Sequence, residues 1–221
     1  MSEVRIVTVT QPLIEGVTTA EEFIAYAARV SNPGNQINTE TAPKLLKYLA
    51  KHKHWSPFEM VSICMEIKTT RDIGRQILRH RSFSFQEFSQ RYAEVTEDFE
   101  LRQARLQDTK NRQNSLQTGD AALHAEWLIY QDDLAKHARE TYKWAILNGI
   151  AKEQARAVLP EGMTRSTMYM NGTLRSWIHY CELRCGNGTQ KEHQEIAIAA
   201  WNLILEKFPS LSEVLDGSTE H

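Results

Sequence analysis

The sequence has few cysteines, little net charge and no long apolar run, and each shortage excludes a class of protein. Its three cysteines, Cys64, Cys181 and Cys185, are an odd number without the spacing of a disulfide framework, which fits a reducing compartment. The formal net charge of -2 provides no global basic field that would gather nucleic acid. No apolar N-terminal segment or bilayer-length run occurs. We therefore expect a soluble, cytoplasmic protein with neither a membrane nor a nucleic-acid partner.

The glycine-based signatures of nucleotide binding are missing as well. No Gly-x-Gly-x-x-Gly and no Walker sequence occurs, so neither a Rossmann site nor a P-loop is indicated. A flavin or nucleotide would need other binding groups. The 221 residues with 41% hydrophobic content allow one sizeable core, and we predict a single domain over residues 1–221.

Hydrophobic periodicity and turn residues predict a mixed α/β (α+β) fold, with several helices packed on a small sheet. Strands are predicted at residues 4–9 and 61–67 and near 163–170. Residues 94–120 are polar and lack periodicity, so we predict a weakly ordered insertion there. The predicted helices are, in chain order, one from a capping box at Thr19, one from about Thr41, one over residues 70–79, a long one bearing Leu123, Trp127, Tyr130, Leu134, Ala138, Thr141 and Ala145, a short one bearing Arg156, one from Leu174 and one over about 191–208.

A segment at residues 79–92 interleaves arginine, serine and glutamate with four aromatic residues. A solvated face does not need those aromatics. Just upstream, Arg71, Arg75 and Arg79 lie four residues apart on the predicted helix, where like charges cost about 0.2 to 0.5 kcal/mol per pair unless they are neutralised. A bound anion is the simplest neutraliser. The alternative is that carboxylates of the same chain pair with these arginines.

The spacing in this segment resembles the signature of the flavin-dependent thymidylate synthases. Arg79-His80-Arg81 is followed by seven residues, then by Ser89, and Arg91 lies two residues further on. Four other segments also resemble this family and occur in the chain in the order expected for it: Ala27-Ala28-Arg29-Val30-Ser31, His52-Lys53-His54-Trp55-Ser56-Pro57-Phe58-Glu59, Ala155-Arg156-Ala157-Val158-Leu159-Pro160 and Leu183-Arg184. The resemblance covers most of the chain. It implies the fold of that family and a homotetramer with active sites shared between subunits.

Two sets of site residues are implied by the resemblance. The implied FAD contacts are Ser56, Arg79, His80, Arg81, Glu87, Thr173, Leu174, Arg175 and His179, with His54 in the flavin and folate pocket. The implied dUMP contacts are Gln76, Ile77, Leu78, Arg79, Glu87, Phe88, Ser89, Gln90, Arg91, Arg156 and Arg184. Guanidinium groups suit this role because their donor fork matches phosphate and pyrophosphate oxygens.

Arg184 is the residue that the resemblance implies to be catalytic, against the uracil ring. The family's reaction methylates dUMP to dTMP, with 5,10-methylenetetrahydrofolate as carbon donor and NADPH-reduced FAD as hydride source. A guanidinium at O4 and N3 would hold the negative charge that develops on the ring. No enzyme nucleophile is required, so Ser89 is expected to position the phosphate. The ordinary alternative for Arg184 is a cation that complements a helix C-terminus.

The sequence departs from the family pattern at two places. Thr173 stands where the family often has Asn, and the loop over residues 186–193 differs from the usual one, which commonly carries a histidine. His193 is a candidate for that histidine. These are the two places where the family's flavin-ring and folate contacts would have to be made by different residues.

Two other functions compete with this interpretation. One is a metal-dependent nucleotide phosphohydrolase that would use His52, His54, Glu59 and Asp72 as ligands. The other is a non-catalytic RNA-binding module built on the arginine and aromatic residues of the 79–92 segment. Our preferred interpretation assigns no metal.

Overall fold

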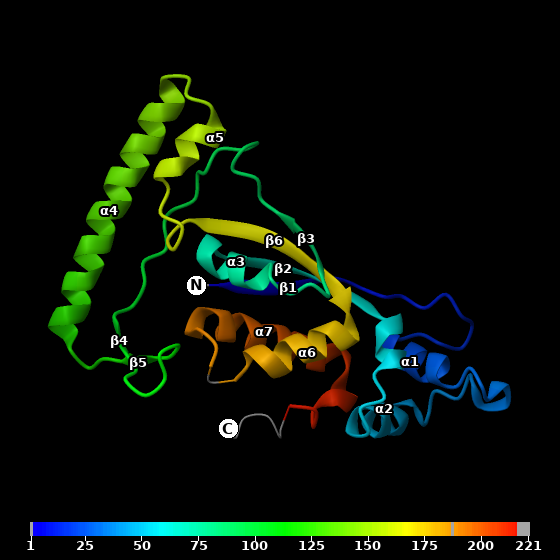
Figure 1. The fold of residues 1–221 in the computed structure, drawn as a ribbon. Coiled ribbons are helices and arrows are strands. Elements are labelled where there is room, and N and C mark those ends of the chain that lie inside the picture. The colour runs from blue at the N-terminus through cyan, green and yellow to red at the C-terminus, as the bar shows by residue number, and fades with distance from the viewer. Residues whose placement is uncertain (1, 187, 216–221) are drawn as a thin grey trace. The chain divides into compact units, whose positions relative to one another are not determined.

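The computed structural model describes residues 2–186 and 188–215, so Asn187 in the divergent loop lies outside it. The chain divides into two compact units, and Figure 1 labels their helices and strands. Unit 1 consists of Met1–Glu3, Lys68–Arg79 and Gln86–Met168. Unit 2 consists of Val4–Ile67, His80–Phe85 and Tyr169–His221. The prediction of one domain over the whole chain stays a prediction.

A four-stranded sheet has the strand order β1-β2-β6-β3. Its members are β1 (Glu3–Val9), β2 (Ser62–Thr70), β6 (Arg165–Thr173) and β3 (Ser84–Glu87). The first three agree with the predicted strands to within a few residues, because long β-branched or alternating segments carry a strong period of two.

Unit 2 contains α1 (Ala20–Ala28), η1 (Pro33–Asn35), α2 (Ala42–Lys51), η2 (Ser56–Met60), α6 (Leu174–Arg184), α7 (Lys191–Lys207) and η4 (Pro209–Leu211). The predicted capping box is confirmed: the Glu22 N–H donates to Thr19 Oγ1 at 3.1 Å, and the Thr19 N–H donates to the Glu22 carboxylate at 3.0 Å. Trp177 and Tyr180 of α6 are fully buried together with Phe58 and Phe208. The core of this unit therefore includes large aromatic side chains beside its aliphatic ones.

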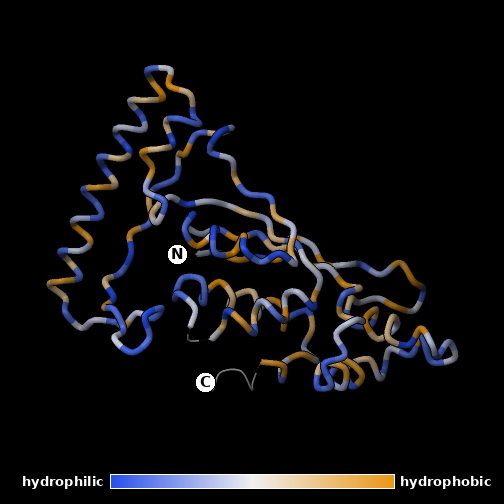
Figure 2. Tube along the Cα trace, in the orientation of Figure 1, coloured by the Kyte–Doolittle hydropathy of each residue, from blue (hydrophilic) through white to orange (hydrophobic). Residues whose placement is uncertain are grey.

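Unit 1 contains α3 (Arg71–Ile77), β4 (Arg105–Gln107), β5 (Ser115–Gln117), α4 (Ala121–Leu147), α5 (Lys152–Ala155) and η3 (Arg156–Val158). Helix α3 ends two residues before the predicted Arg79, because Leu78 is already its C-cap. Strands β4 and β5 pair antiparallel and form a hairpin that the sequence did not predict. Most of this hairpin is hydrophilic (Figure 2), which explains why hydrophobic periodicity did not predict it.

The segment before the hairpin is held to α3 by Arg102. Its Nη2 atom donates to Thr70 Oγ1 at 2.6 Å and to Asp72 Oδ1 at 3.0 Å, and its side chain is only 15% exposed. The Glu100 N–H also donates to the Met163 carbonyl at 2.8 Å. The first part of the predicted insertion therefore packs against α3 within unit 1.

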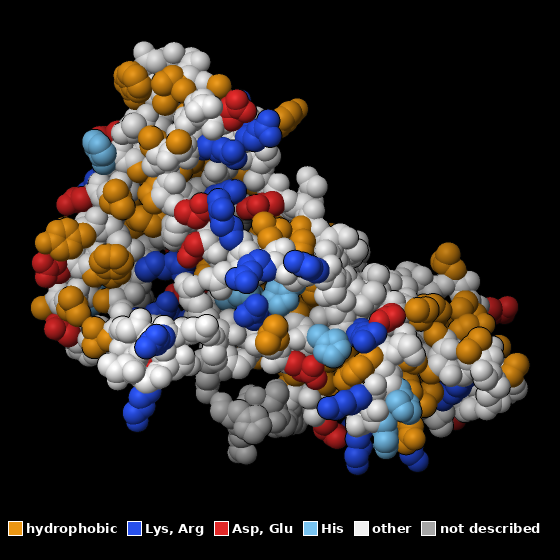
Figure 3. Space-filling model, in the orientation of Figure 1, with side chains coloured by type: hydrophobic (Ala, Val, Ile, Leu, Met, Phe, Trp, Pro, Cys, Tyr) orange, Lys and Arg blue, Asp and Glu red, His pale blue; other side chains and the backbone are white. Residues whose placement is uncertain are grey.

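The long helix α4 is confirmed, with Asp120 as N-cap and Asn148 as C-cap. Its buried positions carry mostly small side chains, such as Ala135, Ala138 and Ala145. The larger members of the predicted apolar stripe are instead on the surface, and Figure 3 shows hydrophobic side chains gathered over this helix: Leu123, Trp127, Tyr130 and Leu134 are 40%, 41%, 62% and 55% exposed. An apolar stripe of this kind is a feature of interaction surfaces.

Within the described ranges, no helix has the length and apolar character needed to cross a membrane.

Candidate active site

The implied site residues belong to both units, and each unit is described by itself. Unit 1 holds residues 76–79, 87–91 and Arg156. Unit 2 holds His54, Ser56, His80, Arg81, Thr173, Leu174, Arg175, His179 and Arg184.

The arginines of α3 are neutralised by carboxylates of the same chain. Arg71 is 16% exposed; its Nη1 atom lies 3.2 Å from Glu87 Oε1, and its Nε atom lies 3.7 Å from Glu161 Oε1. Arg75 forms an ion pair with the same Glu161 carboxylate. The anion hypothesis is therefore wrong for Arg71 and Arg75. Arg79 is exposed and forms no ion pair within the described part of the chain.

Glu87 is held firmly at the end of β3. Besides Arg71, its Oε1 atom accepts a hydrogen bond of 2.8 Å from Ser166 Oγ. The next residue continues the pairing, because the Phe88 N–H donates to the Thr167 carbonyl at 2.9 Å. These contacts fix the position of Glu87 and Phe88, the start of the 87–91 segment, within unit 1.

Unit 1 has a cavity of about 390 Å³ next to this segment, which we call the anion pocket. Its lining includes Gln90, Arg156 and the paired side chains of Arg71, Arg75 and Glu161. Gln90 is only 5% exposed, and its Nε2 donors have no hydrogen-bond partner among the described residues. Arg156 is half-buried and forms no ion pair there. A buried amide donor without a partner is costly unless a ligand oxygen satisfies it.

Ser89 and Arg91 lie on either side of Gln90 in the chain, and both are exposed. The Ser89 carbonyl accepts from the N–H groups of Tyr92 and Ala93, each at 3.0 Å, so this segment forms a hydrogen-bonded turn. Arg91 Nε lies 3.5 Å from Glu153 Oε2 in an exposed ion pair. Such exposed pairs contribute little to stability and separate easily.

In unit 2, Thr173 is the N-cap of α6. Its Oγ1 atom accepts from the Ser176 N–H at 3.2 Å, and the Leu174 N–H donates to the Val61 carbonyl at 2.8 Å. Threonine thus performs the capping role that asparagine also performs, so this departure from the family pattern leaves the start of α6 intact. Arg175 forms an ion pair with Glu59 and is therefore already neutralised.

The position of α6 next to residues 80–85 depends on close aromatic packing. The Phe83 ring lies 4.9 Å from the Trp177 ring, centroid to centroid, and fills the space where a Cβ at Gly172 would lie. That Cβ would be 2.4 Å from Phe83 Cδ1. Trp177 Nε1 donates to the Ile63 carbonyl at 3.0 Å, which fixes the indole in turn.

The predicted catalytic Arg184 and the predicted flavin contact His80 touch each other. Arg184 Nε donates to His80 Nε2 at 3.0 Å. A guanidinium can only donate, so His80 is neutral with its proton on Nδ1. The terminal nitrogens of Arg184 form no hydrogen bond or ion pair within residues 2–186 and 188–215. Arg184 therefore presents its planar fork while its Nε atom is tethered.

Next to His80 lies a buried pair made of Tyr180, which the sequence did not single out, and His193, the candidate for the family's loop histidine. The Tyr180 ring lies 4.9 Å from the His80 ring, and the Tyr180 hydroxyl lies 3.1 Å from His193 Nε2. His193 is fully buried, and burial, assisted by the positive charge of Arg184, lowers its pKa to about 3. Burial raises the pKa of Tyr180. Tyr180 gave no sequence signal beyond its helical spacing from Trp177.

The remaining implied flavin contacts are on the surface of unit 2. His54, Ser56, Arg81 and His179 are all exposed, and Arg81 forms no ion pair within the described ranges. His179 Nδ1 lies 3.2 Å from Glu182 Oε2, and its ring packs against Trp55 at 5.5 Å. An exposed hydroxyl and an unneutralised guanidinium are groups that suit a diphosphate, so they fit an FAD.

The ligand set of the competing phosphohydrolase is not assembled. Across the described residues, no three His, Cys, Asp or Glu side chains converge as metal ligands. Glu59 pairs with Arg175, and Asp72 pairs with Arg102. Each of these carboxylates therefore already neutralises a guanidinium.

Comparisons with known proteins show the family of the chain. Residues 12–210 match the family described as thymidylate synthase complementing protein. The chain is 54% identical over 212 residues to a probable flavin-dependent thymidylate synthase of Paramecium bursaria Chlorella virus 1, covering 96% of this chain and 98% of the relative. It is 47% identical over 217 residues to the flavin-dependent thymidylate synthase of Synechocystis sp., covering 97% and 99%.

A solved structure shows the same fold. A UMP/dUMP methylase from Streptomyces cacaoi, bound with 5-bromo-UMP, superposes with a TM-score of 0.84 at 25% identity, over 99% of this chain and 95% of that chain. The class defined by the matched model and the shared fold is that of the thymidylate synthase complementing proteins. Within it, the chain belongs to the flavin-dependent thymidylate synthase family. The family prediction and the mixed α/β fold prediction are confirmed.

Proposed function

We propose that this protein methylates dUMP to dTMP, with 5,10-methylenetetrahydrofolate as carbon donor and NADPH as the reductant of a bound FAD. The observation that carries the proposal is the hydrogen bond from Arg184 Nε to His80 Nε2 at 3.0 Å. It fixes the guanidinium by its inner nitrogen and leaves the two outer nitrogens for a ligand. A planar pair of donors matches O4 and N3 of a uracil ring.

The chemistry of Arg184 follows from this geometry. Carbon 5 of uracil is a poor nucleophile, so the ring must be polarised before a one-carbon unit is transferred to it. Donors fixed before the reaction stabilise developing negative charge without reorganising, and this is the role we assign to Arg184. His80, being neutral, accepts the hydrogen bond from the Arg184 Nε–H group and adds no competing positive charge.

The anion pocket of unit 1 is the proposed site of the dUMP phosphate. Gln90 supplies a buried amide donor that lacks a partner in the described chain, and Arg156 supplies a cation without an ion pair. We assign Ser89 and Arg91, which lie on either side of Gln90 in the chain and are exposed, to the same phosphate. Residues 76–79, Glu87 and Phe88 complete the proposed dUMP contacts.

FAD, when bound, supplies the hydride chemistry of the reaction. We assign its contacts to Ser56, Arg79, His80, Arg81, Glu87, Thr173, Leu174, Arg175 and His179, with His54 in the shared flavin and folate pocket. Arg79 and Arg81 are exposed and form no ion pair within the described ranges, so both are available to phosphate oxygens. Glu87 and Arg175 are engaged by Arg71 and Glu59, which limits them to contacts by their remaining donor and acceptor atoms.

A homotetramer with shared active sites is the proposed assembly. It is supported by the exposed apolar stripe of α4, since Trp127, Tyr130 and Leu134 face outward while alanines face the unit's own core. We also propose that the chain acts as one domain in the cytoplasm.

The test is to purify the protein and record its absorption spectrum and its formation of dTMP from dUMP, methylenetetrahydrofolate and NADPH. We expect a yellow protein whose turnover requires all three substrates. The double variant Arg79→Ala, Arg81→Ala should lose flavin and still melt cooperatively, whereas Arg112→Ala, an exposed arginine between β4 and β5, should keep it. A colourless protein that binds zinc, manganese or RNA instead would refute the proposal.

A further inference from the structure

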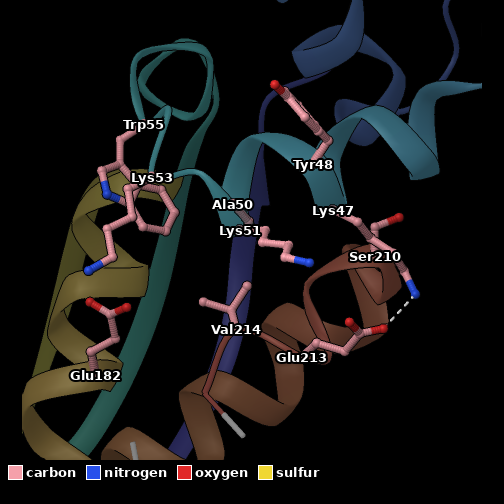
Figure 4. A pocket seen from close by; sticks show the side chains of 10 residues that line it. All are labelled: Lys47, Tyr48, Ala50, Lys51, Lys53, Trp55, Glu182, Ser210, Glu213 and Val214. Atoms are coloured by element: carbon pink, nitrogen blue, oxygen red, sulfur yellow. Dashed lines mark hydrogen bonds and ion pairs between the residues drawn. The ribbon is translucent and has the colours of Figure 1, made fainter. Parts of the chain in front are cut away.

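A second cavity, of about 460 Å³, lies in unit 2, and we call it the lysine pocket. Its lining includes Lys47 and Lys51 of α2, Lys53 and Trp55 of the following loop, Glu182 of α6 and Glu213 near the end of the described chain. Figure 4 shows the side chains that line it. None of the functions assigned above uses this cavity.

Lys53 occupies a backbone position that normally selects glycine. It has φ of 57° and is the only non-glycine residue with positive φ in residues 2–186 and 188–215. Helix α2 ends here in a Schellman motif, in which the His54 N–H donates to the Leu49 carbonyl at 2.8 Å and the Lys53 N–H to the Ala50 carbonyl at 3.0 Å. Glycine is the favoured residue at this left-handed position. A strained residue of this kind is a reason to look for a function of its side chain.

Among the described lining residues, the lysine pocket has three lysines and two carboxylates, an excess of one positive charge. Glu213 Oε1 pairs with Lys47 Nζ at 2.9 Å, while Glu182 Oε2 lies 3.2 Å from His179 Nδ1, a partner that is charged only when protonated. Lys51 and Lys53 are exposed and form no ion pair within the described ranges. The pocket therefore suits an anionic ligand.

The lysine pocket also adjoins the proposed flavin and folate residues of the same unit. Lys53 and Trp55 flank His54 in the chain, and the Trp55 ring packs 5.5 Å from the ring of His179. Trp55 thus belongs both to the wall of the lysine pocket and to the surroundings of a proposed flavin contact. A ligand that starts at the flavin can continue past Trp55 towards the lysines.

We propose that the lysine pocket binds the glutamyl tail of the folate co-substrate, with Lys51 and Lys53 facing its carboxylates and Trp55 facing its aminobenzoyl ring. This inference rests on the proposed function, because that function supplies a folate as the carbon donor. Each added glutamate of such a tail brings another carboxylate. A longer tail therefore meets more of the positive charge.

The arrangement favours separate carboxylates over a phosphate of NADPH. No arginine is among the described residues that line the pocket, and phosphate recognition commonly uses arginine forks or a helix N-terminus. The end of α2 at the pocket is its C-terminus, whose dipole does not attract anions, so the lysine side chains must supply the positive charge. Lys47 and Lys51 are one helical turn apart and Lys53 follows in the loop, so the positive charges are spread along the cavity.

The test compares KM for the monoglutamyl and triglutamyl forms of methylenetetrahydrofolate in the purified enzyme. The variants are Lys53→Gly combined with Lys51→Gln, and Lys44→Gln as the control, because Lys44 is an exposed lysine of α2 that does not line the pocket. In the wild type we expect a KM for the triglutamate roughly three- to tenfold lower, from two partly exposed charge pairs. This advantage should shrink as salt screens the charges.

In the double variant the advantage of the triglutamate should fall below about twofold, and in Lys44→Gln it should stay at the wild-type value. Glycine suits the backbone at residue 53, so the double variant should melt no lower than the wild type. An equal KM for both folates in an active wild type would overturn the inference alone. A rise in the KM for NADPH in place of folate would also overturn it. A wild type that forms no dTMP from either folate would instead contradict the proposed function.

Discussion

Substitution of Arg184 distinguishes two roles for this residue. Its guanidinium either acts in catalysis or only stabilises the end of a helix. Arg184 lies in the last turn of α6, where a cation that complements the dipole contributes about 0.3 to 1 kcal/mol of stability. If that were its whole role, Arg184→Ala would melt slightly lower and turn over normally. Lys207 in the last turn of α7 is the matched control, because it has the same helix position and no place in the site.

The structure predicts a larger effect on rate than on stability. Loss of a preorganised fork that holds developing charge costs on the order of 3 kcal/mol in the barrier, about a hundredfold in kcat. Arg184→Lys should recover little, since an ammonium offers neither the planar fork nor the Nε donor to His80. The assay is dTMP formation, with melting temperatures and flavin spectra measured on the same samples. Turnover of Arg184→Ala within twofold of the Lys207→Ala control would refute the assignment.

Two further predictions concern the frame that holds this site. Gly172→Ala places a Cβ 2.4 Å from Phe83 Cδ1 and should destabilise the protein by roughly 1 to 3 kcal/mol. Gly34→Ala is the control, because a Cβ at Gly34 would have no atom within 4 Å and should not destabilise the protein. Equal melting temperatures for the two variants would contradict this packing argument. His193 has a pKa lowered to about 3, below its ordinary 6.5, because it is buried, so the unfolded chain binds the extra proton first as pH falls. Stability should therefore decline from about pH 6.5 towards 3 by at most about 1.4 kcal/mol per pH unit, and urea unfolding of His193→Gln should show a shallower decline; an unchanged slope would be evidence against this role.

Local signals in the sequence were sufficient for most of the secondary structure. The capping box at Thr19 and the strands β1, β2 and β6 depend on residues a few positions apart, and all of them form. The β4–β5 hairpin escaped prediction because its strands are three residues long and polar. A pattern of two or three residues carries no usable period.

The contacts that define the candidate site are long-range, and the sequence could not supply them. The partner of Arg75 is Glu161, 86 positions away, so the row of arginines on α3 looked unneutralised until the fold was known. The apolar stripe of α4 was predicted as a pattern, but the pattern does not say which face is buried. The tether between Arg184 and His80 joins residues 104 positions apart. The resemblance named both residues without placing them together.

The bond from Arg102 to the start of α3 sets a boundary for shortening this enzyme. Because residues 94–120 are polar, a deletion variant that lacks this whole segment is an obvious way to shorten the protein. That deletion would take away the guanidinium that satisfies Thr70 and Asp72, leaving a partly buried carboxylate at the first turn of α3 without its counter-ion. A cut confined to the β4–β5 hairpin would spare this bond. The part of the insertion that can be removed thus lies between Arg102 and Asp120, the N-cap of α4.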